Sequence, residues 1–305
     1  MSVYRGVTSV LVASGLQEFE WYDAPHGERE LRNTRSATKT ATGMLVGAAI
    51  DRGLIRDVRD EIADYLGKRS SSDPMLPIGV TIDELLTMSS CLDCNDDDPT
   101  SPGNEELMYS TADWLAFARS IPLGRARESR TFRYCTAHTV LLGAAVEAAS
   151  GAELSEFADE VLFTPLGITN AKWFRSETGL AFPGGGLELR SRDLRALGEL
   201  YLRGGAWAGQ QVVSKEWVER STRAHARVDD TTSYGYLWWL RSYPSPRGEL
   251  ELWLMLGNGG NKVVVFPQLG AVVVITATNF GKPGMHQLTD GLLRDRILPE
   301  LLDAT

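Results

Sequence analysis

Hydrophobic and polar positions divide this chain into three stretches of different texture. Near the N-terminus, apolar or alternating runs at 7–13 and 16–22 flank Ser14-Gly15, a pattern typical of a β-hairpin. Residues 54–190 show apolar spacing typical of short helices separated by loops. The remaining stretch predicts four strands and then a closing amphipathic helix, at 234–240, 250–256, 261–266, 271–277 and 286–302.

The longest helical pattern runs from Ser36 to Gly53 and is apolar nearly all round, which predicts a central, buried helix. Strands at both ends with helices between them predict an α+β fold. In this fold a single antiparallel sheet, built from both termini, is flanked by helices and carries an inserted, mainly helical region. We therefore expect residues 1–53 and 190–305 to form an α/β sheet domain and residues 54–189 to form the helical insertion.

Composition narrows the range of partners. The chain has 305 residues, of which 43% are hydrophobic and 23% charged, and its net charge is −9. This length is enough for one large core or two interlocked subdomains. The acidic balance argues against nucleic acid as a partner, and no apolar run approaches the roughly 18–20 residues of a membrane span. We expect a small-molecule substrate, no nucleic acid and no membrane, whereas the oligomeric state is left open.

The cysteines and the N-terminus bear on the compartment. Cys91, Cys94 and Cys135 are odd in number and form no disulfide framework, which favours a reducing setting. The start, Met1 to Arg5, has no cationic leader followed by an apolar core. We therefore expect a cytoplasmic protein, although a periplasmic or secreted chain trimmed of its leader has the same pattern.

No metal site or cofactor is predicted. The Cys-x-x-Cys pair has no second ligand pair at zinc spacing. The run that begins at Asp93 resembles the opening of a calcium loop, yet Asp98 and Asn104 stand where such a loop needs glycine and glutamate. A solvated acidic loop is the interpretation we favour.

Ser36-Ala37-Thr38-Lys39 carries the strongest chemical signal. On a helix, residues three apart share a face, with about 5–6 Å between Cβ atoms, so the Lys39 ammonium can reach the Ser36 hydroxyl. A lysine in a dry pocket has a lowered pKa and can accept a proton, and unpaired N–H groups at a helix start favour a developing oxyanion. The motif predicts a serine nucleophile, but chance also supplies this spacing, so other residues must decide.

Two further segments offer matching chemistry. Tyr134 precedes a small-residue helix at 139–149, where it is either a proton shuttle beside the lysine or a buried core tyrosine. The turn Gly257-Asn258-Gly259-Gly260-Asn261 lies between two strands and either admits a substrate close to the backbone or is a plain hairpin. Three aromatic residues either line an acyl pocket or pack in the core: Tyr109, Trp238 and Trp239.

The order of a Ser-x-x-Lys motif, a tyrosine turn and a late glycine-rich turn resembles the serine β-lactamase and penicillin-binding superfamily. The chain resembles more closely its class C β-lactamase-like serine hydrolases, which include esterases and nylon-oligomer amide hydrolases. The resemblance covers nearly the whole chain. Three further motifs carry it: Thr81–Ser90 resembles the family's "hLLTMTSGL" stretch, Thr164–Ile168 its "PLGM" turn and Gly184–Leu187 its "GGGL" loop.

This resemblance implies a β-lactamase-like fold and a set of roles. Ser36 attacks the carbonyl, Lys39 is the neighbouring base or charge partner, and Tyr134 shuttles the proton to the leaving group. Backbone N–H groups of Ser36 and Asn261 form the oxyanion hole. The residues expected to contact substrate are Asn258, Gly259, Gly260, Tyr109, Trp238 and Trp239.

Two departures from the family pattern narrow the expected substrate. Thr136 replaces the asparagine of the Tyr-x-Asn motif, and Asn258 replaces the cation of the Lys-Thr-Gly or His-x-Gly motif. We therefore expect a serine hydrolase that cleaves a small ester or amide through an acyl-enzyme. The alternatives are a β-lactamase or D-alanyl-D-alanine peptidase, and a non-catalytic ligand-binding relative.

Overall fold

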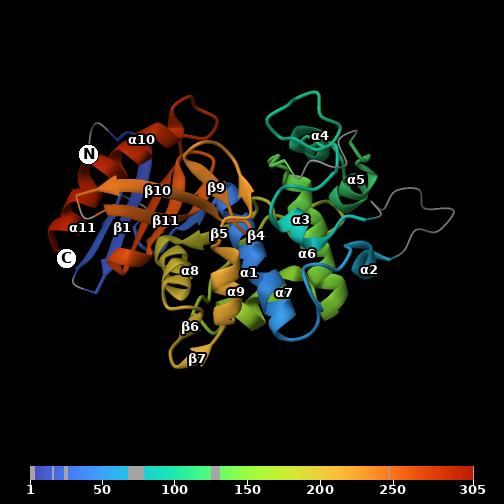
Figure 1. Ribbon diagram of the computed structural model, residues 1–305, viewed down its shortest axis with the longest axis horizontal. Helices are drawn as coiled ribbons and strands as arrows, with labels where there is room; N and C mark the ends of the chain where they lie inside the picture. The colour runs from blue at the N-terminus through green and yellow to red at the C-terminus, as the bar shows by residue number, and fades with distance from the viewer. Residues whose placement is uncertain are drawn as a thin grey trace.

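The computed structural model describes residues 4–15, 17–23, 27–67, 79–124, 131–246 and 248–304. Its largest element is an eight-stranded antiparallel sheet with the strand order β2-β1-β13-β12-β11-β10-β9-β8 (Figure 1). The strands are β1 (Val7–Ser14), β2 (Glu18–Tyr22), β8 (Ala226–Arg227), β9 (Thr232–Tyr234), β10 (Trp239–Ser245), β11 (Gly248–Gly257), β12 (Asn261–Phe266) and β13 (Ala271–Ala277).

The two ends of the chain meet in this sheet, which confirms the prediction of one sheet built from both termini. Strand β1 pairs with β13 from Val7↔Ala277 to Ser14↔Ala271. One predicted strand, 234–240, is wrong, because β9 ends and β10 begins inside it. Leu237 interrupts it with φ 59° and donates its backbone N–H to the Leu86 carbonyl at 3.0 Å.

Helices cover both faces of the sheet, and successive side chains of the central strands point alternately into the core on one face and the core on the other. Val272 and Val274 belong to the core shared with α8 (Ser191–Leu202), whereas Val273 and Ile275 belong to a second core beneath the C-terminal helices. The C-terminal helices are α10 (Met285–Leu292), η4 (Leu293–Ile297) and α11 (Leu298–Ala304). The predicted closing helix at 286–302 is confirmed as one unbroken helical run, in which η4 is a π-helical turn between α10 and α11.

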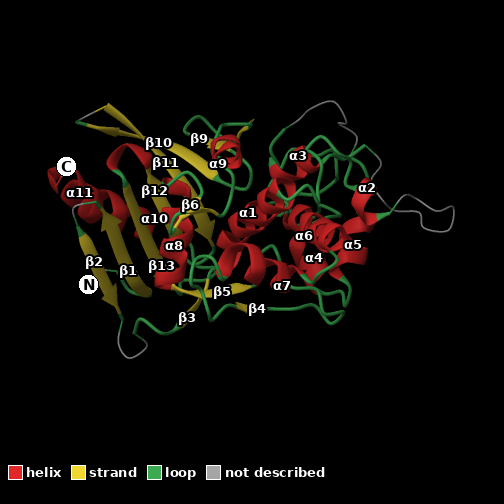
Figure 2. Cartoon of the chain, turned by 90° about the horizontal axis from the view of Figure 1, so that it is seen from below, coloured by secondary structure: helices red, strands yellow, loops and turns green. Residues whose placement is uncertain are grey.

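A mainly helical region lies beside the sheet, as predicted (Figure 2). The helices not yet given are η1 (Arg35–Ala37), α1 (Thr38–Asp51), α2 (Ala63–Leu66), α3 (Ile82–Leu86), α4 (Glu105–Tyr109), α5 (Trp114–Ser120), α6 (Thr136–Ser150), α7 (Leu154–Ala158), η2 (Asp159–Phe163), α9 (Lys215–Ser221) and η3 (Pro267–Leu269). The remaining short strands are β3 (Leu31–Asn33), β4 (Lys172–Trp173), β5 (Leu187–Arg190), β6 (Ala206–Trp207) and β7 (Gln210–Gln211). The division at residues 53/54 and 189/190 stays a prediction.

Helix α1 is the buried centre that its pattern predicts. All its residues from Thr38 to Ala49 are buried, and it packs against α6. Gly47 has no room for a side chain, because a Cβ there would lie 2.3 Å from Nε1 of Trp217. The sequence predicted a single helix from Ser36, but Ser36 lies in the short helix η1, which leads directly into α1. In the described part of the chain, no helix combines the length and apolarity needed to cross a membrane.

Candidate active site

Ser36 and Lys39 come together as their spacing predicts. The Lys39 side chain is buried, and its Nζ donates to Ser36 Oγ at 3.2 Å and to the Gly184 carbonyl at 2.6 Å. Burying an ammonium is costly unless hydrogen bonds compensate. The carbonyl meets that requirement and also fixes the direction in which Nζ points, so this nitrogen is held beside the Ser36 hydroxyl.

The Gly184-Gly185-Gly186 loop owes its glycines to its neighbours. A Cβ on Gly184 would lie 2.5 Å from Cγ2 of Thr136, so only glycine brings this carbonyl close enough to Lys39. The "GGGL" resemblance marked this loop as a family motif but gave it no role in the site. The structure assigns it the task of holding the lysine.

Tyr134 also lies beside Lys39, and Nζ of Lys39 is 5.0 Å from the centre of the tyrosine ring. Burial raises the pKa of Tyr134, while the Lys39 charge and hydrogen bonds with Ser36 and Lys39 lower it. The three predicted catalytic side chains therefore share one hydrogen-bonded cluster.

The glycine-rich turn packs beside the nucleophile. Helix η1 contacts β11 and β12, and a Cβ on Gly257 would lie 2.1 Å from the Thr34 carbonyl and 3.2 Å from the backbone nitrogen of Ala37. Gly259 and Gly260 have φ of 90° and 91°, which glycine adopts without strain. The start of β12, where Asn261 lies, is thus held against the segment that carries Ser36.

The side chains of this turn are used internally. Asn261 Nδ2 donates to the carbonyls of Asn258 (2.7 Å) and Ala277 (3.0 Å). Asn258 Oδ1 accepts from the backbone N–H of Gly281 at 2.8 Å, and the Gly259 N–H donates to the sulfur of Met285 at 3.1 Å. The hydrogen bonds just described lie within the protein and involve no cation. Contact of Asn258, Gly259 and Gly260 with substrate stays a prediction.

A cation that the sequence did not single out lies next to the nucleophile instead. Arg35 is exposed, has φ 49°, and places its guanidinium 4.3 Å from the centre of the Phe280 ring. A positive φ in a residue other than glycine stores backbone strain and is concentrated at functional sites. The Phe280 ring in turn lies against Gly259, where a Cβ would approach it to 2.6 Å.

The three aromatic residues predicted to line a pocket have different positions. Trp238 is fully buried and packs on Tyr201, with ring centres 4.7 Å apart, which favours the core alternative for this residue. It lies in the core because the chain reverses direction at Leu237. Trp239 packs 5.7 Å from the Tyr134 ring and supports the predicted proton shuttle. Tyr109 is 43% exposed and remains a candidate for substrate contact.

Two acidic residues reach this site from the loop expected to be solvated. Asp96 Oδ2 accepts the backbone N–H of Thr136 at 2.6 Å, and Glu105 Oε2 accepts the Thr136 hydroxyl at 2.8 Å. Burial raises the pKa of Asp96 to about 6, and the Lys39 charge opposes that rise. The sequence signalled an acidic loop, but only the fold places its members beside Tyr134 and Lys39.

The expectation of unpaired cysteines is wrong. Cys94 and Cys135 form a disulfide across 41 residues, with Cα atoms 5.6 Å apart, and Cys91 is free. The bond ties the acidic loop to the residue after Tyr134. Disulfides are rare in reducing compartments, so this one is at odds with the reasoning that led to a cytoplasmic setting.

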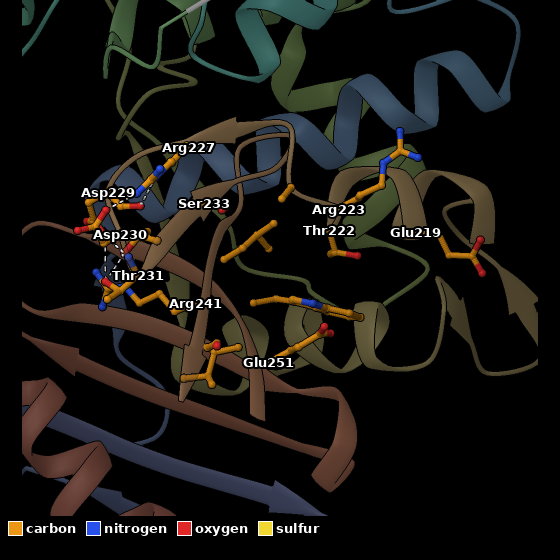
Figure 3. Close-up of a pocket in the computed structure, with 16 residues that line it drawn as sticks. Glu219, Thr222, Arg223, Arg227, Asp229, Asp230, Thr231, Ser233, Arg241 and Glu251 are labelled. Atoms are coloured by element: carbon orange, nitrogen blue, oxygen red, sulfur yellow. Dashed lines mark hydrogen bonds and ion pairs between the residues drawn. The ribbon is translucent and has the colours of Figure 1, made fainter. Parts of the chain in front are cut away.

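Other chemistry lies away from Ser36. His138 is buried, its Nε2 is 2.8 Å from Ser90 Oγ, and burial lowers its pKa to about 3, so it is a neutral structural histidine. Among the described residues, no cluster of histidine, cysteine and acidic side chains is arranged to hold a metal. A separate hollow of about 700 Å³ is lined by Glu219, Arg241 and Glu251 among others (Figure 3). None of the residues predicted to form the active site lines it.

Comparison with known proteins identifies the class to which this architecture belongs. The beta-lactamase family model matches residues 3–296, so the chain belongs to that family and is a hydrolase of the serine type. A 6-aminohexanoate-dimer hydrolase from Paenarthrobacter ureafaciens is 26% identical over 299 residues, which cover 90% of this chain and 74% of that protein.

Solved structures agree on the fold. A penicillin-binding protein from Bacillus halodurans matches with a TM-score of 0.73 at 18% identity, covering 96% of this chain and 97% of the other. A D-stereospecific amidohydrolase from a Streptomyces species matches with a TM-score of 0.70 at 17% identity, covering 94% of this chain and 93% of the other. The predicted β-lactamase-like α+β fold is thereby confirmed.

Proposed function

We propose that this chain hydrolyses a small ester or amide through an acyl-enzyme on Ser36. The observation that carries the proposal is the contact between the buried Lys39 ammonium and the Ser36 hydroxyl, with the Tyr134 ring packed beside them. A serine hydroxyl is a weak nucleophile and needs such a neighbour to lose its proton during attack. The named activity of the Paenarthrobacter relative supports an amide as one substrate class.

The cluster supports a two-step reaction. Ser36 Oγ bonds to the carbonyl carbon while its proton passes to the unprotonated member of the Lys39–Tyr134 pair, which is either the neutral Lys39 amine or a Tyr134 phenolate beside the Lys39 ammonium. The electron pair of the C=O bond moves to the carbonyl oxygen. Backbone N–H groups of Ser36 and Asn261 stabilise that oxyanion, at roughly 2.7–4 kcal/mol for each donor. The bond to the leaving group breaks as Tyr134 returns the proton to it. Water then attacks the acyl-enzyme by the same route, which releases the acid and restores Ser36.

An activated aryl ester tests this proposal. Acyl-enzyme accumulation produces an initial burst of the aryl alcohol, equal in amount to the enzyme, before the steady state. In Ser36→Ala the burst disappears and the steady rate falls by roughly 10⁴-fold or more. Ser89→Ala removes the hydroxyl of a buried serine that pairs with Thr87 outside the cluster, and as the control it keeps the burst. A burst that survives in Ser36→Ala contradicts the proposal.

The alternatives are separated by two further measurements. A chromogenic cephalosporin tests for β-lactamase activity, and we expect little turnover because Asn258 supplies no cation for the β-lactam carboxylate. A fluorophosphonate probe followed by peptide mapping tests for a non-catalytic binding protein. A covalent adduct on Ser36 supports the hydrolase, and intact Ser36 after prolonged exposure favours the binding protein.

A further inference from the structure

The loop between Cys94 and α4 is attached to the catalytic turn through Asp96. The Asp96 backbone N–H donates to the Tyr134 carbonyl at 2.8 Å. Its carboxylate accepts two backbone N–H groups, from Thr136 at 2.6 Å and from Glu105 at 3.0 Å. Asp96 therefore holds the backbone on both sides of Cys135, at the first turn of α6, where a negative charge is also favoured by the helix dipole.

Charged groups face Asp96 from each element around it. Lys39 faces it from α1, and its charge favours the ionised carboxylate. Glu105 faces it from α4, and together with burial this charge opposes ionisation, so the pKa of Asp96 rises to about 6. Tyr134 faces Asp96 from the segment just before α6. Burial raises the pKa of the Tyr134 hydroxyl, and the negative charge of Asp96 adds to that rise. An ionised Asp96 thus favours a protonated Tyr134, the form that gives a proton to a leaving group.

The contacts of Thr136 show why this chain needs such a residue. The family resemblance places an asparagine at this position, and its amide orients the lysine or the substrate. Here the Thr136 hydroxyl donates to Glu105 at 2.8 Å and its N–H donates to Asp96, so both of its donors bind acidic side chains. The acidic loop takes over the orientation of this turn, and the disulfide from Cys94 to Cys135 fixes its distance from α6.

We propose that Asp96 is a positioning residue which, as a carboxylate, holds Tyr134 in place against Lys39 and Ser36. This inference rests on the proposed function, since Tyr134 must act in proton transfer for its placement to matter. Proton transfer is sensitive to misplacement of about 1 Å, which costs on the order of 100-fold in rate. Below a pH of about 6 the Asp96 carboxyl is protonated, so one of its oxygens no longer accepts a backbone N–H, and the turn that carries Tyr134 loosens.

The test compares Asp96→Asn with Asp98→Asn. Asp98 is exposed two residues further on, and its carboxylate accepts the backbone N–H and the hydroxyl of Thr100, at 2.9 Å and 2.7 Å. With an aryl ester we expect kcat of Asp96→Asn to fall about 10- to 100-fold while KM stays within about threefold. The fall in wild-type kcat as the pH drops through about 6 is lost in this variant. Asp98→Asn keeps both the rate and the pH profile of the wild type.

Asp96→Glu covers the case in which Asp96→Asn does not fold. It keeps the carboxylate but moves it by one methylene, so we expect a reduced kcat with the acid limb of the pH profile retained. Melting temperatures and thiol titration show whether each variant is folded with its disulfide intact. Wild-type kcat and an unchanged acid limb in both Asp96 variants overturn the inference.

Failure of this inference is distinct from failure of the proposed function. Labelling of Ser36 by a fluorophosphonate is measured in the same proteins. If wild type labels and both Asp96 variants match it in rate and pH dependence of turnover, only the positioning role is wrong. If Ser36 of the wild type does not label and no ester is cleaved, the hydrolase proposal fails and the role of Asp96 falls with it.

Discussion

The chemical groups that flank Ser36 differ between its sheet side and its helical side. On the sheet side, the turn 257–261 presents glycines and backbone groups, and its two asparagine side chains are bound within the turn and to the adjoining Gly281 loop. On the helical side, ionisable side chains meet: Lys39, Tyr134, Asp96 and Glu105. The sheet side is rigid because its strands are paired on both edges, whereas a disulfide secures the helical side.

This difference matches the two demands of acyl transfer. A developing oxyanion is best stabilised by fixed dipoles that need no reorganisation, and backbone N–H groups held by a sheet meet that demand. A proton in transit needs groups whose pKa values respond to one another, and side chains in a partly buried cluster meet that demand. The predictions below test this division of labour, from the largest expected effect to the smallest.

Removing the lysine tests the helical side most severely. In Lys39→Ala, kcat/KM for an aryl ester falls by about 10⁴-fold, because the pair that accepts the Ser36 proton loses the lysine, either as the base itself or as the charge that favours the Tyr134 phenolate. Steady-state kinetics measure the loss, and circular dichroism checks the fold. Lys172→Ala changes an exposed lysine and keeps wild-type activity. Activity of Lys39→Ala within tenfold of wild type contradicts the assignment.

Removing the disulfide tests what secures the helical side. Cys94→Ser or Cys135→Ser opens a loop of 41 residues, which lowers the free energy of unfolding by about 4 kcal/mol if the chain-entropy estimate holds. Urea titration with and without reductant measures this loss. Cys91→Ser leaves the disulfide intact and keeps wild-type stability. Equal stability of the reduced and oxidised wild type counts against the bond as a structural tie.

Gly257→Ala tests the rigidity of the sheet side. The new Cβ would lie 2.1 Å from the Thr34 carbonyl, so η1 must move and carry Ser36 with it. We expect a fall of about 100-fold in kcat/KM with a smaller change in melting temperature. Gly15→Ala is the matched control, because a Cβ there has no neighbour within 4 Å. Wild-type activity in Gly257→Ala shows that this contact does not position the nucleophile.

Tyr109→Phe probes the edge of the helical side and has the smallest expected effect. The variant loses the hydrogen bond from the Tyr109 hydroxyl to Glu105 at 2.9 Å, and with it one restraint on the carboxylate that holds Thr136. A neutral or weakly charge-assisted bond contributes about 0.5–1.5 kcal/mol, so kcat falls two- to tenfold at about constant KM. A rise in KM without a change in kcat indicates direct substrate contact instead.

The sequence predicted most of the fold because its signals are local. The continuous apolar runs of β12 and β13, which are buried on both faces, and the all-round apolar pattern of α1 follow from which faces each element buries. The segment 234–240 misled because a positive φ at Leu237 is stabilised by a contact with Leu86, 151 positions earlier in the chain (237 − 86), which no local pattern reveals.

For the site, the sequence alone determined the pairing of Ser36 with Lys39, since helical geometry brings residues three apart onto one face. The family resemblance added Tyr134 and the glycine-rich turn. Only the tertiary structure placed Asp96, Glu105 and the Gly184 carbonyl around that pair, because these groups approach from loops distant in the chain. It alone also joined Cys94 to Cys135, since pairing depends on the distance between their Cα atoms and not on their spacing in sequence.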